Sequence, residues 1–232
     1  MNLRLRIGVG SLVFAALSGA AHADQIYSSS YNEPNGEGQV VGGNYNYWDG
    51  SYTGGTGNPT EDGYFGSYLS GGSGQLTNGQ ITEVPWYDDS NDEGTGAYVG
   101  WFTFDPVITF NFSSDVTIDT VELNMDASAI GGVYLPADVV IDGTSYSVDQ
   151  SLDGSQAPIE LTFSGLDLTG NSLTIELDRR VDPNYSAYLS DGHDWVFLNQ
   201  AQFFGPSSSV PAPAALGPFA AGLIALGRKR RK

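Results

Sequence analysis

The acidic segment 88–94 carries side chains suited to binding a metal ion. Asp89, Asn91 and Glu93 stand at alternate positions and a glycine follows them, which is the order of oxygen ligands in the first half of a Ca²⁺-binding loop. A complete twelve-residue loop ends on a glutamate, but Gly100 occupies that position in this chain. We therefore expect these residues either to form a simpler Ca²⁺ site or to lie in a solvated acidic turn.

The segment 45–52 carries aromatic side chains that could bind a sugar. Its surroundings are rich in glycine and asparagine, which is typical of a surface loop. An aromatic ring offers a flat apolar face on which the apolar face of a pyranose can stack. Because Tyr45 and Tyr47 are two residues apart, they could equally share one buried face of a strand. The predicted glycan-stacking residues are Tyr45, Tyr47, Trp48 and Tyr52.

Catalysis by histidine has one candidate beyond residue 23, namely His193, which Asp194 follows. The preceding residues 190–192 are Ser-Asp-Gly, a sequence typical of a turn. The chain also has no Gly-x-Ser-x-Gly nucleophile motif. The absence of cysteine excludes a thiol nucleophile, a disulfide scaffold and a Cys-ligated metal site. With 27 acidic residues, close carboxylate pairs are expected by chance and do not by themselves identify a glycoside hydrolase. We name no catalytic residue and expect a protein that is not an enzyme.

The charge of the chain is unevenly distributed. The formal net charge is -18, but the segment 24–209 contains 27 acidic residues and only two basic ones, Arg179 and Arg180. A surface this negative repels phosphate backbones, so nucleic acid is excluded as a partner.

The middle of the chain predicts an all-β fold. Segment 24–100 is rich in Gly, Asn, Ser and Tyr, which favours short strands and long loops over a core. Asp142-Gly143 separates two β-branched or aromatic runs and predicts a tight hairpin. We expect one antiparallel β-sandwich domain over residues 24–206, a jelly roll rather than an immunoglobulin-like domain. The predicted strands are 98–104, 107–112, 116–125, 137–141, 146–148, 158–163, 172–177 and 195–204.

Several short motifs of this middle segment resemble a discoidin-like, galactose-binding-like domain. Leu76-Thr77-Asn78-Gly79 followed by Trp86 resembles the opening of that domain, and 195–205 resembles its closing strand. The resemblance implies a galactose-binding-like sandwich and a preference for carbohydrate. It also implies a structural Ca²⁺ near Asn78 and Gln200. Family members usually have Asp at the position of Asn78 and often have Glu at the position of Gln200.

The first 23 residues have the features of a secretory signal peptide. Two arginines precede a short apolar run, and Ala21-His22-Ala23 supplies the small residues that signal peptidase accepts at positions Ala21 and Ala23. We therefore expect an exported protein whose mature chain begins at Asp24.

The segment 207–232 has the features of a membrane-retention tail. Val210, Pro211, Ala212 and Pro213 precede the apolar segment 214–227, which at 14 residues is shorter than the ~20 that span a bilayer. The chain then ends in a basic stop made of Arg228, Lys229, Arg230, Arg231 and Lys232, which favours the cytoplasmic side.

This order of features resembles the PEP-CTERM sorting signal of bacteria that make extracellular polysaccharide, with Ala212 in place of the usual Glu. The resemblance implies a short transmembrane helix, anchoring in the inner membrane during transit, and processing by an exosortase-type transpeptidase. The processed protein is then expected at the cell surface or in the extracellular matrix. A plain C-terminal membrane anchor is the alternative for this segment.

Together these observations predict an exported, non-catalytic protein associated with extracellular polysaccharide or biofilm, with glycan binding as its expected activity. Two alternatives stay open, a secreted polysaccharide-active hydrolase and a purely structural matrix protein. A hydrolase would bring carboxylates of raised pKa together in a cleft, whereas a structural protein would show neither a cleft nor an exposed aromatic cluster.

Overall fold

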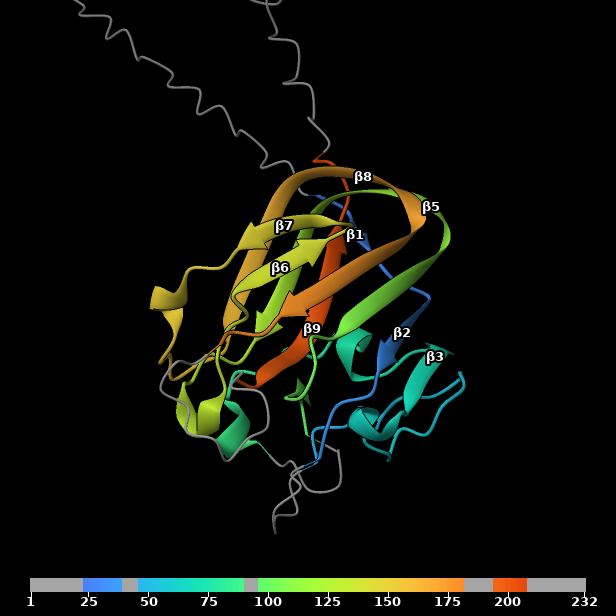
Figure 1. The fold of residues 1–232 in the computed structure, drawn as a ribbon. Coiled ribbons are helices and arrows are strands. Elements are labelled where there is room, and N and C mark those ends of the chain that lie inside the picture. The colour runs from blue at the N-terminus through green and yellow to red at the C-terminus, as the bar shows by residue number, and fades with distance from the viewer. Residues whose placement is uncertain (1–22, 39–45, 90–95, 182–193, 208–232) are drawn as a thin grey trace, which may run out of the picture. The chain divides into compact units, whose positions relative to one another are not determined.

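The computed structural model describes residues 23–38, 46–89, 96–181 and 194–207, and their regular structure consists of nine β-strands and short 3₁₀ helices (Figure 1). The strands are β1 (Gln25–Ile26), β2 (Ser30–Pro34), β3 (Tyr68–Gly72), β4 (Val99–Trp101), β5 (Val107–Met125), β6 (Asp138–Ile141), β7 (Thr144–Ser147), β8 (Ile159–Asp178) and β9 (Val196–Phe204). The 3₁₀ helices are η1 (Gly63–Phe65), η2 (Gln75–Thr77), η3 (Trp86–Asp88), η4 (Ile130–Gly132) and η5 (Gln150–Leu152). All strand pairs within the sheet are antiparallel, so the predicted all-β antiparallel fold is confirmed.

The two longest strands, β5 and β8, pair along most of their length and curve together (Figure 1). Their register shifts twice, between Asn111 and Val116 and between Ile118 and Thr120. A shift of this kind bends and twists a strand. It also changes which positions face the core, from the even-numbered residues Ile108, Phe110 and Phe112 to the odd-numbered Val121, Leu123 and Met125.

The bend divides the sheet into two layers that share β5 and β8. In the first layer the strand order is β3-β2-β5-β8-β6-β7, and in the second β9 pairs with the other half of β5 and with β1 and β4. The inner faces meet in the core, where the Phe203 ring of β9 lies 4.9 Å from Phe110 and 5.4 Å from Phe112 between ring centroids. The described part of Ala23–Pro206 is therefore a β-sandwich made by folding one sheet on itself.

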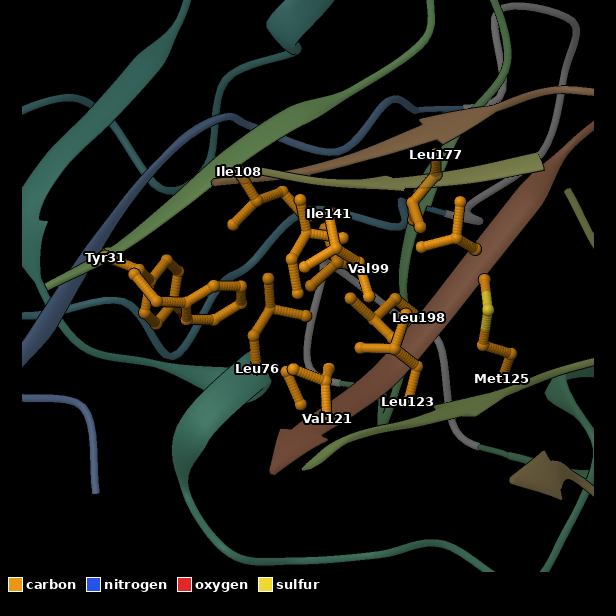
Figure 2. Packing of buried hydrophobic residues seen from close by; sticks show 14 of the residues in the cluster. Tyr31, Leu76, Val99, Ile108, Val121, Leu123, Met125, Ile141, Leu177 and Leu198 are labelled. Atoms are coloured by element: carbon orange, nitrogen blue, oxygen red, sulfur yellow. The ribbon is translucent and has the colours of Figure 1, made fainter. Parts of the chain in front are cut away.

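The main hydrophobic core lies between these layers (Figure 2). Figure 2 shows Ile108, Ile141 and Leu177 of the first layer near Leu123 and Leu198 of the second. The alternation that predicted strands in the sequence corresponds to one buried and one more exposed face in β2, in β6 and in much of β5 and β8. Strand β4 and most of β9 are buried on both faces.

Each predicted strand overlaps an observed strand, but several bounds differ, two pairs of predicted strands are joined, and three observed strands were not predicted. Segments 107–112 and 116–125 are continuous in β5, and 158–163 and 172–177 are continuous in β8, because a strand can bend at a bulge without ending. The predicted hairpin joins β6 and β7, and Asp142 and Gly143 have φ of 49° and 81°, as a primed two-residue turn requires. Strands β1, β2 and β3 lie in the Gly-rich segment, where no strand was delimited.

The terminal segments of the chain fall largely outside the described residues. Ala23–Pro206 forms one unit. The signal peptide apart from Ala23, the sorting motif 210–213, the apolar segment 214–227 and the basic stop 228–232 are outside the described residues and remain predictions. Among the residues that the structure describes, no helix has the length and apolarity needed to cross a membrane.

Candidate functional site

The aromatic residues predicted as a sugar platform are largely buried. Tyr47 is 5% exposed and Tyr52 is 7% exposed. The Tyr47 ring packs 4.4 Å from Phe197 and 5.3 Å from Trp195, centroid to centroid. The Tyr52 hydroxyl donates to the Tyr31 carbonyl at 2.7 Å. The prediction that Tyr47 and Tyr52 offer free ring faces is therefore wrong, because both rings are used to pack the long loops against the sandwich.

The other two members of that predicted platform do not replace them. Trp48 is only partly exposed, and its indole N–H is buried without a hydrogen-bond partner. Tyr45 lies outside the described residues.

A different group of rings is exposed, and we call it the aromatic surface: Tyr64, Phe65 and Tyr68. Their side chains are 58%, 69% and 52% exposed. The rings of Tyr64 and Phe65 meet edge to face with centroids 5.1 Å apart. Isolated exposed apolar residues are common on proteins, whereas here two exposed rings are in contact and a third exposed ring, that of Tyr68, follows three residues after Phe65 in the sequence.

The turn that carries Tyr64 and Phe65 is held in place by hydrogen bonds between its backbone and the side chains of Asp62 and Asn35. The Asp62 carboxylate caps η1 by accepting the Tyr64 N–H at 2.7 Å. Gly66 ends the turn with φ of 102°, a conformation that glycine adopts without strain. Asn35 donates from its amide to the Glu61 carbonyl at 2.9 Å, which ties the turn to the end of β2. The rings thus project from a supported backbone.

Tyr68 begins β3, whose only partner strand among the described elements is β2. On its other side β3 is bridged by Thr53 and Thr56, which pair with Ser73 and Ser70, so Tyr68 lies in the last regular strand of this layer but not on an open edge. Partial burial and the nearby Glu33 charge raise the pKa of the Tyr68 hydroxyl, so it stays a neutral hydrogen-bond donor near neutral pH. The sequence signal that could have located this site is Asp62-Gly63-Tyr64-Phe65-Gly66, an aromatic pair inside a capped glycine turn.

The charge around the aromatic surface is negative. Glu61 and Asp62 lie just before the rings in the sequence, separated from Tyr64 by Gly63. The two arginines of the described residues are engaged elsewhere, Arg179 with Asp105 at 3.1 Å and Arg180 with Asp153 and Asp194 at 2.9 and 3.1 Å. No basic side chain among the described residues is therefore available to pair with an acidic sugar here.

A second aromatic cluster encloses a small cavity and serves packing. Tyr47, Trp86, Trp195 and Phe197 line a cavity of about 80 Å³ together with Gly131 and Val133. This volume is well below the several hundred Å³ of a typical ligand pocket. The Trp86 indole N–H donates to the Ile130 carbonyl at 3.2 Å, which joins η3 to η4.

The predicted metal ligands of the acidic segment are only partly described. Asp89 accepts a hydrogen bond from the Ala97 backbone N–H, as in a self-contained turn, while Asn91 and Glu93 lie outside the described residues. Across the described part of the chain, no group of three His, Cys, Asp or Glu side chains converges as metal ligands would. Ca²⁺ binding at Asp89, Asn91 and Glu93 stays a prediction.

The Ca²⁺ position that the galactose-binding-like resemblance implies is formed by neutral groups. Gln200 lines a cavity of about 30 Å³ with Ser28, Thr77 and Gly79, and the Gln200 carbonyl oxygen and Ser28 hydroxyl are buried without a partner. The side-chain amide oxygen of Asn78 accepts a hydrogen bond from the Gln80 N–H at 2.7 Å. Ca²⁺ sites rely on carboxylates, and this cavity lining has none. The residues do not fit Ca²⁺, whereas the cavity has the size and polarity that suit one water molecule.

Three of the carboxylates that have a raised pKa are buried and line none of the described cavities. Burial raises the pKa of Glu33, Glu37 and Asp49, and all three side chains are buried, with at most 3% exposure. A glycosidase needs two carboxyl groups on either side of a bound sugar. These three carboxyls do not offer that arrangement, since a sugar cannot reach them in this conformation.

No protein-family model and no curated protein matches the sequence. Solved structures with similarity to the chain include carbohydrate-binding modules. The family 32 module from Streptococcus pneumoniae EndoD is 11% identical, covers 59% of this chain and 88% of its own, and has a TM-score of 0.33.

Two further modules are similar to the same extent. The family 32 module from C. perfringens NanJ, solved in complex with galactose, is 10% identical over 57% of this chain and 87% of its own, with a TM-score of 0.32. The CBM32 of AlyQ, solved in complex with 4,5-unsaturated mannuronic acid, is 17% identical to this chain. The match covers 47% of this chain and 78% of the AlyQ module, with a TM-score of 0.32. Similarity at this level assigns no ligand to the present chain.

Proposed function

We propose that this chain is an exported, non-catalytic protein that binds a glycan through the aromatic surface of Tyr64, Phe65 and Tyr68. The observation that carries the proposal is the exposure of these rings on a capped, supported turn. A ring that is already exposed and held in place loses little conformational freedom when a sugar stacks on it. The carbohydrate-binding modules among the similar structures agree with the proposal without adding to its argument.

The charge of the domain narrows the class of glycan. Segment 24–209 has a net charge of -25, and acids flank the aromatic surface with no described basic side chain free to face a uronate. Like charges disfavour association. The expected ligand is therefore a neutral or cationic polysaccharide rather than an acidic one.

Simultaneous replacement of Tyr64 and Phe65 by alanine is expected to weaken glycan binding about 10- to 100-fold, because two stacking contacts of about 1 kcal/mol each are lost. The measurement is binding of the full chain to an array of neutral, cationic and acidic polysaccharides, followed by isothermal titration with the best ligand. Tyr27→Ala is the matched control, since Tyr27 is 74% exposed but lies beside β1, and it should bind normally.

The two alternative functions, a polysaccharide-active hydrolase and a purely structural matrix protein, would give different results in the same binding assay. Absence of binding by the unaltered chain to every glycan would favour the purely structural matrix protein. Release of shortened sugars from a bound polysaccharide would favour the hydrolase. Binding that is unchanged by the double substitution would place the ligand elsewhere.

The proposed route to the cell surface has its own test. If signal peptidase and an exosortase-type enzyme process the chain, its mature form begins at Asp24 and lacks the basic stop. Mass spectrometry of both ends of the protein isolated from its native cell envelope and culture medium measures this directly. An intact Lys232 on the extracellular protein would contradict processing and favour a plain membrane anchor.

A further inference from the structure

Glu33 carries a buried carboxyl group that lacks hydrogen-bond donors. Tyr31 and Glu33 are the two buried residues of β2, and Glu33 is 0% exposed. Both oxygens of its carboxyl group are without a hydrogen-bond partner. An ionised carboxylate is strongly unfavourable in such a place, because neither water nor a protein donor stabilises its charge.

Two other buried carboxyl groups show the contrast. Glu37, which is 3% exposed, accepts hydrogen bonds from the Thr103 N–H at 3.0 Å and from the Thr103 hydroxyl at 2.6 Å. Asp49, which is 0% exposed, accepts hydrogen bonds from the Tyr31 hydroxyl and from a backbone N–H at 3.0 Å. Hydrogen-bond donors stabilise an ionised carboxylate. Glu33 is therefore the one of these three buried carboxyl groups that has no such support.

The surroundings of Glu33 offer no positive charge. The basic side chains of the described residues, Arg179 and Arg180, form ion pairs elsewhere in the sandwich. Strand β5 has no titratable side chain over 109–111, where it pairs with β2. The titratable groups that interact electrostatically with Glu33 are Tyr31 on β2, Asp49 and Tyr52 in the loop after β2, and Tyr68 on β3. All four are acids, so none of them can balance a negative charge on Glu33.

The end of β2 that contains Glu33 supports the aromatic surface. In the β2–β3 pair Glu33 lies opposite Leu69, the residue that follows Tyr68. Two positions after Glu33, the Asn35 N–H donates to the Ser67 carbonyl at 3.1 Å, and the Asn35 side chain holds the turn of η1. A disturbance at Glu33 is therefore placed to reach both the strand and the turn that carry the exposed rings.

We propose that Glu33 is a proton-dependent lock on the β2–β3 pair. As the neutral acid, Glu33 packs in the interior and the two strands stay paired. When Glu33 ionises, its charge must reach water, which requires the end of β2 to separate from β3. The pair is thus firm at acidic pH and loosens as the pH rises. An effect of the lock on glycan binding rests on the proposed function, whereas the lock itself does not.

The direction of the pH dependence follows from proton linkage. Burial first and the Asp49 charge second raise the pKa of Glu33 well above its ordinary value of 4.5. The folded chain therefore keeps a proton that the unfolded chain releases. The resulting stability is fully present below the ordinary pKa and is lost as the pH rises through the raised one. Between these two pKa values each pH unit lowers the folding equilibrium constant about tenfold.

The first test is thermal unfolding of the full chain and of Glu33→Gln between pH 4.5 and pH 8. Glutamine has the shape of the protonated side chain and cannot ionise. Relative to this variant, the Tm of the unaltered chain should fall by about 3–5 °C per pH unit between the two pKa values. Glu160→Gln, which removes an exposed carboxylate on β8, is the matched control and should keep the pH dependence of the unaltered chain. A Tm difference between Glu33→Gln and the unaltered chain that is the same at every pH would overturn the proposal.

Two measurements on the unaltered chain do not require a variant to fold. Its infrared spectrum at pH 6 should contain the band of an uncharged carboxylic acid, and this band should disappear as the pH is raised. Hydrogen exchange of segment 61–72, corrected for the intrinsic effect of pH, should become faster over the same range. Absence of the band at pH 6 would mean that Glu33 is ionised in the folded chain. Exchange that follows only the intrinsic rate would mean that ionisation leaves the strands paired. Either result contradicts the lock.

Glycan affinity measured from pH 5 to pH 8 tests whether the lock reaches the aromatic surface. One pH unit above the midpoint of opening, about a tenth of the chains remain locked, so the affinity of the unaltered chain should be about 10-fold lower than that of Glu33→Gln. Identical pH profiles in the two proteins would overturn this link. Absence of glycan binding at every pH would overturn the proposed function, and the unfolding, infrared and exchange measurements would still decide the lock.

Discussion

Trp101→Ala is expected to lower the free energy of unfolding by about 3–5 kcal/mol, the range for deleting a large buried aromatic side chain. Trp101 lies on β4, is completely buried and belongs to the main core. Its indole N–H donates to the Pro34 carbonyl at 2.8 Å, so it also joins β4 to the end of β2. Urea unfolding monitored by tyrosine and tryptophan fluorescence measures the change.

Trp101→Phe separates the two contributions of this residue. It keeps most of the apolar volume and removes the hydrogen bond, so a loss of about 1–3 kcal/mol is expected from the unpaired Pro34 carbonyl and the smaller ring. A loss below 1 kcal/mol for Trp101→Ala would show that the core can collapse around the cavity, contrary to the close packing described above.

Arg180→Met is expected to lower the free energy of unfolding by about 3 kcal/mol at pH 7. The Arg180 guanidinium bonds Asp153 at 2.9 Å and Asp194 at 3.1 Å, and it lies 3.8 Å from the centroid of the Tyr134 ring. The two carboxylate side chains are 9% and 1% exposed, whereas that of Arg180 is 26% exposed. Removing one partner of such a cluster costs about 3–5 kcal/mol, and the partial exposure of the arginine favours the lower end.

The effect of Arg180→Met should become smaller as pH falls. Burial raises the pKa of Asp153, opposed by the Leu135 N–H and by Arg180, so the substitution moves this pKa further upward. The folded variant then takes up protons at a higher pH than the unaltered protein, and its relative stability increases toward pH 4. Urea unfolding at pH 7 and pH 4.5 measures the difference.

Arg180→Lys keeps the charge but loses the forked geometry and the stacking on Tyr134. It should therefore be intermediate in stability between the unaltered protein and Arg180→Met. A pH-independent loss in Arg180→Met would instead attribute the effect to packing of the arginine stem.

The sequence by itself determined the fold class. Alternation of apolar residues at Leu173, Ile175 and Leu177 placed a strand that the structure contains within β8. The turn Asp142-Gly143 placed the β6–β7 hairpin, since few residues accept φ above zero. Both signals are local, because each depends on residues a few positions apart.

The fate of the aromatic residues was decided by tertiary structure. Tyr47 and Tyr64 both lie in Gly-rich loops, yet Tyr47 packs against Phe197, 150 positions later in the sequence, and Tyr64 faces solvent. Composition identified the residue type that binds sugars but could not tell which rings the sandwich would cover. For the same reason, prediction of the platform at Tyr47 and Tyr52 was wrong.

The burial of Glu33 and Asp49 follows the same division. Sequence alternation in β2 places Tyr31 and Glu33 on one face, and Asp49 is one acid among the 27 of the chain. Only the folded loop brings Asp49 to that face, and only burial between the layers removes the water that would otherwise solvate Glu33. Strand and turn patterns are local properties of a chain, whereas solvent exposure and the electrostatic neighbours of a side chain depend on contacts between distant segments.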